Sequence, residues 1–235
     1  MIPRLHLVTD DRVLEAPGFP DRVREVARVA EEADRPVALH LRGPGLSGRR
    51  LWERGRELRS LVGEGRVRLF VNDRVDLALI LGNRGVHLGA RSLPPRAARR
   101  ILGPEALLGR SVHGAQEVRE LERDPGGLAA LDYLVVGTLY ATPSHPHREG
   151  AGPGRVREVA AVADLPLLGI GGVTPERVHE VVGAGAHGVA VVRAVWDAPD
   201  PGAAVKAFLH ALESDEPGEP GASSRDRMMR PTHGE

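Results

Sequence analysis

Short apolar runs alternate with amphipathic segments along most of the chain, a pattern typical of repeated strand–helix units. The runs that have the length of a strand are residues 5–9, 37–41, 67–71, 85–88, 107–111, 132–136, 166–170 and 187–194. Segments with helical spacing follow them, as in residues 20–33, where apolar positions recur at i, i+3, i+4 and i+7 from Val23. Because most connections are short, we expect parallel strands joined by right-handed crossovers. The pattern predicts an α/β fold, a single (β/α)8 TIM barrel.

The predicted barrel takes up residues 1–213 as one domain. From Ser214 onward the chain is polar and rich in proline and glycine. Such a composition cannot bury enough apolar surface to offset the entropy of ordering the chain. We therefore predict that residues 214–235 form a disordered polar tail.

Composition excludes several classes of function. Lys and Arg together number 32, and so do Asp and Glu, so no basic field favours nucleic acid. The absence of cysteine excludes thiolate catalysis, cysteine metal sites and disulfides, and is in keeping with a cytoplasmic protein. No run approaches the ~18 apolar residues of a membrane span. Lys206 is the only lysine and lies in the closing helix, which argues against Schiff-base chemistry.

A glycine pair marks a candidate phosphate site. Gly171 and Gly172 follow the seventh apolar run and precede a helix start, Thr174 with Pro175. Open backbone N–H groups beside a helix N-terminus favour an anion. In TIM barrels the loops after strands 7 and 8 commonly hold phosphate, and residues 192–193 end the eighth run. The alternative is a tight turn that needs glycine for packing alone.

Polar residues also gather where the other predicted strands end, the position of TIM-barrel active sites. They are Thr9, Asp10, His40, Arg42, Asn72, Asp73, His87, Ser111, His113, Thr138, Thr142, Ser144 and His145. His40 and Arg42 share one side of their strand and face the barrel interior if Ala38 does. Simpler interpretations are a helix N-cap for Asn72 with Asp73, a hydrogen-bonded barrel histidine for His87, and a solvated loop residue for His145.

Eight motifs in order resemble those of the thiamine phosphate synthase/TenI family, over about residues 4–213. They are residues 5–10 (LHLVTD), 69–74 (LFVNDR), 85–89 (GVHLG), 109–113 (GRSVH), 132–133 (DY), 137–142 (GTLYAT), 169–172 (GIGG) and 188–192 (GVAVV). The resemblance implies a cytoplasmic barrel of thiamine biosynthesis that binds a thiazole phosphate. It places Gly171, Gly172, Val192 and Arg193 around that phosphate.

For the synthase branch, the resemblance implies that a pyrimidine diphosphate is joined to the thiazole with Mg²⁺, held partly by Asp73. Ser111 matches the serine near the pyrimidine, and Thr142 with Ser144 matches a Thr-x-Thr pair. Arg42 and Asn72 are further candidates for substrate binding.

Three positions depart from the synthase pattern. Its Gln-Leu-Arg-x-Lys motif reads His40-Leu-Arg-Gly-Pro44 here, so the lysine is lost. Ser92 stands where the second Mg²⁺ aspartate is expected, and His145 stands where a lysine follows Thr-x-Thr. The TenI branch is not matched cleanly either, because its histidine in the loop after strand six corresponds to Thr138.

From these departures we place a tautomerase-like function first, a metal-independent proton transfer on a thiazole phosphate with no cofactor. His113, His145 or His40 would shuttle the proton. The alternatives are the Mg²⁺-dependent coupling synthase and a non-catalytic thiazole-phosphate carrier or sensor. The expected partner is a small-molecule phosphate, with neither nucleic acid nor membrane, and association into a homo-oligomer is left open.

The predicted tail can be tested by truncation. Removing residues 216–235 should leave the melting temperature and the activity nearly unchanged, because this segment has too little apolar surface to dock. Thermal unfolding of the full and truncated chains measures the difference. A loss of more than a few degrees would mean that the tail packs on the barrel.

Overall fold

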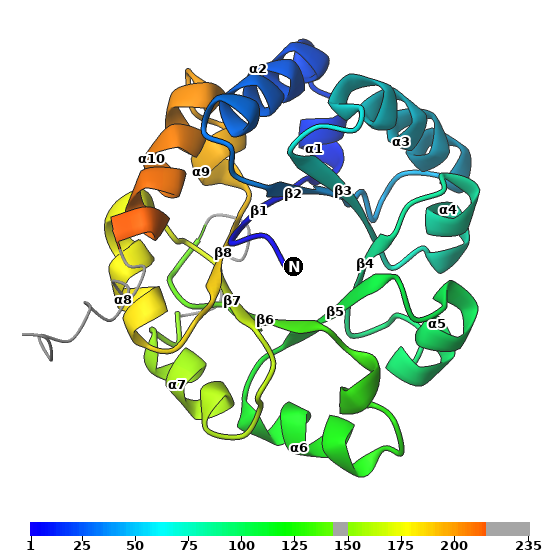
Figure 1. Cartoon of the computed structure of the whole chain (residues 1–235), viewed down its shortest axis with the longest axis vertical. Coiled ribbons are helices and arrows are strands. Elements are labelled where there is room, and N and C mark those ends of the chain that lie inside the picture. The colour runs from blue at the N-terminus through cyan, green and yellow to red at the C-terminus, as the bar shows by residue number, and fades with distance from the viewer. Residues whose placement is uncertain (143–149, 215–235) are drawn as a thin grey trace, which may run out of the picture.

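The computed structural model describes residues 1–142 and 150–214, which form one closed barrel (Figure 1). Its strands are β1 (Leu5–Val8), β2 (Val37–Leu41), β3 (Val67–Asn72), β4 (Gly85–Leu88), β5 (Leu107–Val112), β6 (Tyr133–Gly137), β7 (Leu167–Ile170) and β8 (Gly188–Val191). Each strand pairs in parallel with the next, and β8 closes the sheet on β1. The prediction of a (β/α)8 barrel is confirmed.

Helices form the outer ring around the sheet (Figure 1). They are α1 (Asp11–Leu14), α2 (Phe19–Glu32), α3 (Gly48–Val62), α4 (Val75–Ile80), α5 (Pro95–Leu102), α6 (Ala115–Arg123), α7 (Gly154–Ala160), α8 (Val178–Gly183), α9 (Arg193–Trp196) and α10 (Pro201–Ser214), with 3-10 turns η1 (Leu128–Ala130) and η2 (Pro175–Arg177). Among the described residues, no helix has both the length and the apolar composition needed to cross a membrane. The predicted tail lies outside the described residues except for Ser214, which ends α10.

Alternation along the strands separates two packed layers. Outward-facing residues such as Leu39 and Leu41 join the large cluster between the sheet and the helices. Inward-facing residues form a smaller cluster that contains Ala38, Phe70 and Tyr133. His40 is on the same side of β2 as Ala38, so the expectation that it faces the barrel interior is confirmed.

Glycine on β5 makes room for the largest interior ring. A Cβ on Gly109 would lie 2.1 Å from Tyr133 Cζ. Tyr133 is fully buried, and its ring centroid lies 6.0 Å from that of Phe70 and 5.7 Å from that of His87. The small residue and the large ring therefore depend on one another, as close packing requires.

Three local predictions need correction. The eighth strand ends at Val191 rather than at residue 194, because Val192 leaves the extended region (φ −118, ψ −83) and α9 begins at Arg193. The Trp196 indole holds this turn by donating to the Val8 carbonyl at 3.0 Å. Residues 72–73 do not cap α4, whose N-cap is Arg74. Thr174 occupies the predicted N-cap position but forms no side-chain cap hydrogen bond, and the helix opens as the 3-10 turn η2.

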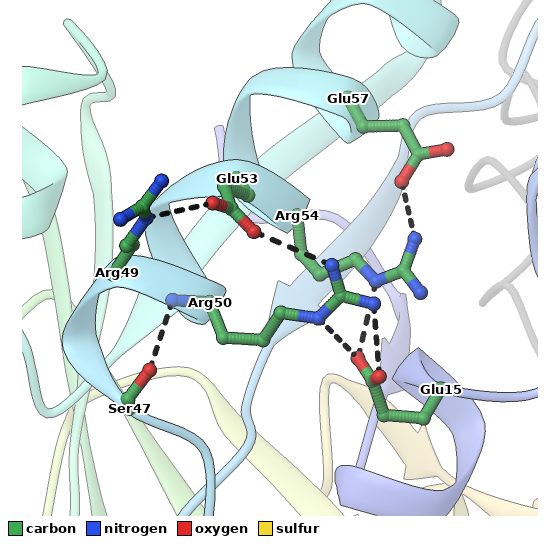
Figure 2. Close-up of polar contacts among 7 residues, drawn as sticks. All are labelled: Glu15, Ser47, Arg49, Arg50, Glu53, Arg54 and Glu57. Atoms are coloured by element: carbon green, nitrogen blue, oxygen red, sulfur yellow. Dashed lines mark hydrogen bonds and ion pairs between the residues drawn. The ribbon is translucent and has the colours of Figure 1, made fainter.

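Ion pairs connect the segment that follows β1 with helix α3, which follows β2 (Figure 2). Glu15, which ends α1, accepts hydrogen bonds from Arg50 Nε at 3.0 Å and Arg54 Nε at 3.3 Å on α3. The Asp11 carboxylate accepts from Gly45 N at 3.1 Å, and Ser47 caps α3 as predicted. Exposed pairs of this kind stabilise a fold only slightly, so their effect is to position these two segments.

Gly109→Ala tests the packing of the barrel interior. The added methyl group must displace the Tyr133 ring, and we expect it to lower the free energy of unfolding by about 1–3 kcal/mol. Urea denaturation gives the value. Gly154→Ala is the matched control, because a Cβ at the start of α7 meets nothing within 4 Å. Equal stability of the two variants would contradict the close contact.

Candidate functional site

A cavity of about 340 Å³ opens at the carboxyl ends of the strands. It is lined by Val8, Asp10, Arg42, Ser111, Val112, His113, Val135, Gly137, Thr138, Ile170, Val192 and Arg193. These residues come from or directly follow β1, β2, β5, β6, β7 and β8. Five of the residues predicted for catalysis or substrate binding line this one space: Arg42, Ser111, His113, Val192 and Arg193. We call it the first cavity.

A second cavity of about 360 Å³ adjoins the first and shares Arg42 with it. It is lined by Arg42, Gly43, Pro44, Leu46, Leu51, Asn72, Asp73, Arg74, Gly89, Ala90 and Arg91. A larger space of about 740 Å³ lies where β3, β4 and β5 begin, and none of the predicted site residues lines it. Candidate chemistry therefore belongs to the two adjoining cavities at the strand ends.

The glycine pair has the backbone conformation that only glycine adopts readily. Gly171 has φ 102 and Gly172 has φ 62. A Cβ on Gly171 would lie 2.5 Å from Thr138 Cγ2, and one on Gly172 would lie 2.7 Å from the Ala141 carbonyl oxygen. Packing against the loop after β6 therefore requires both glycines. They follow Ile170, which lines the first cavity, but do not line it themselves.

Arg193 supplies a direct signal for an anion. Its Nε atom is buried and, among the described residues, has no hydrogen-bond partner. A buried donor without a partner costs about 1–3 kcal/mol, and more when it is charged, so a bound group that accepts from this atom would stabilise the site. Arg193 lies at the N-terminus of α9 and lines the first cavity. An anionic group of a ligand would satisfy the guanidinium.

Below the cavities, hydrogen-bonded side chains fill the barrel interior. His87 Nε2 lies 2.8 Å from Ser111 Oγ, and His87 Nδ1 lies 3.3 Å from the Tyr133 hydroxyl. His40 lies 2.8 Å from Asn72 and, through Nε2, 2.8 Å from His6 Nδ1. Sequence reasoning missed His6 and Tyr133 as parts of the site. For His6 a signal existed, a histidine at an inward position of an otherwise apolar strand.

Burial keeps these histidines neutral. Desolvation lowers the pKa of His40 to about 4. Desolvation also holds the pKa of His6 and of His87 well below the ordinary value. Electrostatic interactions with neighbouring histidines add to this effect, and for His87 so do those with Arg42 and Arg110. His87 therefore matches the hydrogen-bonded barrel histidine considered above. His40, a candidate proton shuttle, has both ring nitrogens engaged inside the barrel.

Asp73 does not cap α4, and contacts with the loop after β4 fix its side chain instead. It has φ 63, rare for a residue with a side chain, and its Oδ1 accepts from Gly89 N at 2.9 Å and from the Ser92 hydroxyl. Within the described residues, no three His, Asp or Glu side chains form a metal cluster. Mg²⁺ that is shared with phosphate groups needs only one or two carboxylates, so Asp73 fits a site that a diphosphate completes.

Of the predicted shuttle histidines, His113 is the one that lines the first cavity. It is partly exposed, its Nδ1 lies 3.2 Å from Glu117 Oε1, and Arg155 donates to its carbonyl oxygen. Ser144 and His145 lie outside the described residues, and Thr142 is the last residue before that gap.

Comparison with known proteins adds to this geometry. The family model for thiamine monophosphate synthase matches residues 5–195. The thiamine-phosphate synthase of Natronomonas pharaonis is 42% identical over 199 residues, covering 83% of this chain and 91% of that protein. The bifunctional protein ThiM/ThiE of Symbiobacterium thermophilum is 54% identical over 142 residues, which cover 60% of this chain and only 28% of that protein. A solved structure, the thiamine phosphate pyrophosphorylase from Pyrococcus furiosus, aligns with a TM-score of 0.73 and 29% identity over 90% of this chain and 96% of that one.

Gly172→Val tests the phosphate site. The new side chain would strain a positive φ and press on the loop after β6, and so shift the groups around a bound phosphate. We expect binding of a phosphate ligand to weaken by about 1–3 kcal/mol, as measured by isothermal titration.

Gly103→Val is the control for Gly172→Val. Gly103 also has a positive φ of 81, but a Cβ there meets nothing within 4 Å. Circular dichroism checks that both variants fold. Unchanged affinity in a folded Gly172→Val chain would remove phosphate binding from this turn.

Proposed function

Because the chain belongs to the thiamine monophosphate synthase family, we propose that it is a thiamine-phosphate synthase, which couples a pyrimidine diphosphate to a thiazole phosphate. One observation carries the proposal: two cavities of similar size adjoin at the strand ends and share Arg42. A transfer between two phosphorylated substrates needs two neighbouring sites. An isomerisation of one substrate needs only one.

The first cavity suits the thiazole phosphate. Arg193 there has a buried Nε that takes no hydrogen bond from the described residues, and α9 begins beside it. These groups favour a phosphate dianion, and the turn at Gly171 and Gly172 follows the cavity residue Ile170. Apolar side chains such as Val8, Val135 and Ile170 also line this cavity, which suits an aromatic ring.

The second cavity suits a diphosphate. Arg42, Arg74 and Arg91 line it, and Asp73 lies among them. The lysine expected at Pro44 and the carboxylate expected at Ser92 are absent, which favoured the tautomerase in the sequence. Arg42 and Arg74 belong to the matched motifs, and Arg74 is paired with Asp76. Arg91 lies outside those motifs and adds cationic charge to the same space, which offsets the lost lysine.

In the proposed reaction the C–O bond to the diphosphate breaks and the pyrimidine methylene carbon forms a bond to the thiazole. Negative charge develops on the departing diphosphate, and Arg42 stands where it can neutralise that charge from between the two substrates. When bound, Mg²⁺ would supply further neutralisation of the diphosphate oxygens, with Asp73 as its carboxylate ligand. The Ser111 hydroxyl, held by His87, lines the first cavity and would orient a substrate ring that enters it.

A proton-transfer function is the second candidate, and His113 is the observation in its favour. This histidine lines the first cavity and is held by Glu117, as a general acid or base would be. His40 is less suited, because burial lowers its pKa to about 4 and both its nitrogens are engaged. The relative from Natronomonas pharaonis, however, is named a thiamine-phosphate synthase.

An assay of pyrophosphate release decides between these functions. The purified chain with both substrates should release pyrophosphate and form thiamine phosphate only when Mg²⁺ is present. Asp73→Asn should lower this rate by about 10²-fold or more, because the carboxylate that would hold Mg²⁺ at the leaving diphosphate is lost. Asp21→Asn is the matched control, since Asp21 is exposed on α2 and pairs only with Arg24 among the described residues.

Two other outcomes would contradict the synthase proposal. Metal-independent proton exchange on a thiazole phosphate, without pyrophosphate release and lost in His113→Ala, would establish the tautomerase instead. Binding of the thiazole phosphate with no turnover of either kind would indicate a carrier or sensor.

A further inference from the structure

We propose that His6 and His40 are positioning residues that fix the side-chain amide of Asn72, with its NH2 group toward the barrel interior and its carbonyl oxygen toward the second cavity. Three contacts in series carry this inference. His6 Nε2 lies 3.1 Å from the Pro3 carbonyl oxygen, His6 Nδ1 lies 2.8 Å from His40 Nε2, and His40 Nδ1 lies 2.8 Å from the Asn72 amide. We call this series the histidine relay.

The direction of each hydrogen bond follows from the end of the relay at Pro3. A carbonyl oxygen only accepts, so His6 Nε2 must carry the hydrogen that it shares with Pro3. A neutral imidazole has one N–H, so His6 Nδ1 accepts and His40 Nε2 donates. His40 Nδ1 then has no hydrogen and can only accept. The Asn72 group that faces it must therefore be the NH2 donor.

The opposite arrangement leaves one contact unsatisfied. The Asn72 atom nearest His40 is assigned as Oδ1, but the oxygen and nitrogen of an amide have the same shape and are told apart by their partners. With oxygen at that position, His40 Nδ1 must donate to Asn72. Either one of the two histidines is then doubly protonated, or His6 donates through Nδ1 to His40 and the lone pair of His6 Nε2 faces that of the Pro3 carbonyl oxygen. Burial opposes the first, since a pKa of about 4 leaves roughly one His40 in 10³ protonated at pH 7.

Aromatic packing holds the relay rings in place. The Phe70 ring stacks on His40 with centroids 5.1 Å apart and planes 13° from parallel. The ring centroid of His6 lies 5.5 Å from that of Phe70 and 5.4 Å from that of Tyr133. His6 is wholly buried and His40 is 1% exposed, so water cannot replace a lost partner. A ring flip would exchange nitrogen for carbon at two contacts and cost both hydrogen bonds.

The relay determines what the second cavity can recognise. Asn72 and Asp73 line this cavity together, and the relay turns an acceptor oxygen toward it beside the carboxylate. The ligand group held at this corner is therefore a hydrogen-bond donor or a cation, and not a phosphate oxygen. This inference goes beyond the proposed function and holds whichever reaction the chain catalyses.

Nitrogen-15 NMR of the whole, unmodified chain tests the relay without any mutation. Long-range ¹H–¹⁵N correlation at pH 7.5 should show His6 and His40 as neutral Nε2–H tautomers. The Asn72 NH2 group should show a coupling across its hydrogen bond to His40 Nδ1. An Nδ1–H tautomer at His40, or protonation of both nitrogens of either ring, would overturn the proposal.

Asn72→Asp supplies a second test. A carboxylate only accepts, so it cannot serve His40 Nδ1, and we expect His40 to gain an Nδ1–H and its pKa to rise. If His40 donated to Asn72 in the native chain, its nitrogen shifts would keep their native tautomer pattern in this variant, and the proposal would fail. Asn83→Asp is the matched control, because Asn83 donates to the Gly85 carbonyl and has no contact with the relay.

The tautomer measurement and the pyrophosphate assay are independent. Nε2–H tautomers without Mg²⁺-dependent turnover would leave the relay intact and remove the synthase proposal. Turnover with an Nδ1–H tautomer at His40 would do the reverse. If Asn72→Asp does not fold, the spectrum of the native chain still decides the question.

Discussion

Closure of the sheet is the constraint on which the rest of the molecule depends. Residues 5–7 of β1 pair in parallel with residues 189–191 of β8, so the two ends of the fold share one ladder of hydrogen bonds. Because every strand runs in the same direction, all eight carboxyl ends meet at one rim. Asp10 and Arg193 therefore line one cavity although almost the whole barrel separates them in sequence. The candidate site exists only in the closed form.

The same closure decides what fills the barrel. Eight strands leave an interior just wide enough for side chains. Here Phe70 and Tyr133 share this interior with three histidines, each hydrogen-bonded to a neighbour. Burying polar groups is tolerable when each has a hydrogen-bond partner. The hydrogen-bonding groups of such a network that are not used inside the barrel then face the cavities at the carboxyl ends of the strands. Core packing and ligand recognition are in this way properties of the same residues.

How much could be predicted from the sequence depends on how local each feature is. Apolar runs place strands such as β2 and β4 correctly, because their ends are set by the residues themselves. The end of β8 was misplaced because residues 191–195 are mostly apolar, while the turn is held by Trp196 on a carbonyl 188 residues away. Contacts of that range leave no local pattern.

The candidate site likewise contains residues that the sequence identifies and contacts that it does not. Arg42, Ser111 and Arg193 could be identified because strand ends are visible in the pattern and share one rim. The orientation of Asp73 could not, since it depends on Gly89 and Ser92 across a loop. Each histidine stands out in its own strand, but the pairing of His6 with His40 was hidden, because 34 residues separate them in the sequence.

The position of Lys206 has a practical consequence. It is the only lysine of the chain, and it is exposed on α10, in the outer ring of helices. Arginine guanidinium groups do not react under the conditions that acylate amines, since they remain protonated. An amine-reactive dye or surface would therefore find no side-chain target at the strand ends, where every cationic residue is arginine or histidine. Coupling through Lys206 would attach the protein by its outer ring of helices and not by a side chain of either cavity.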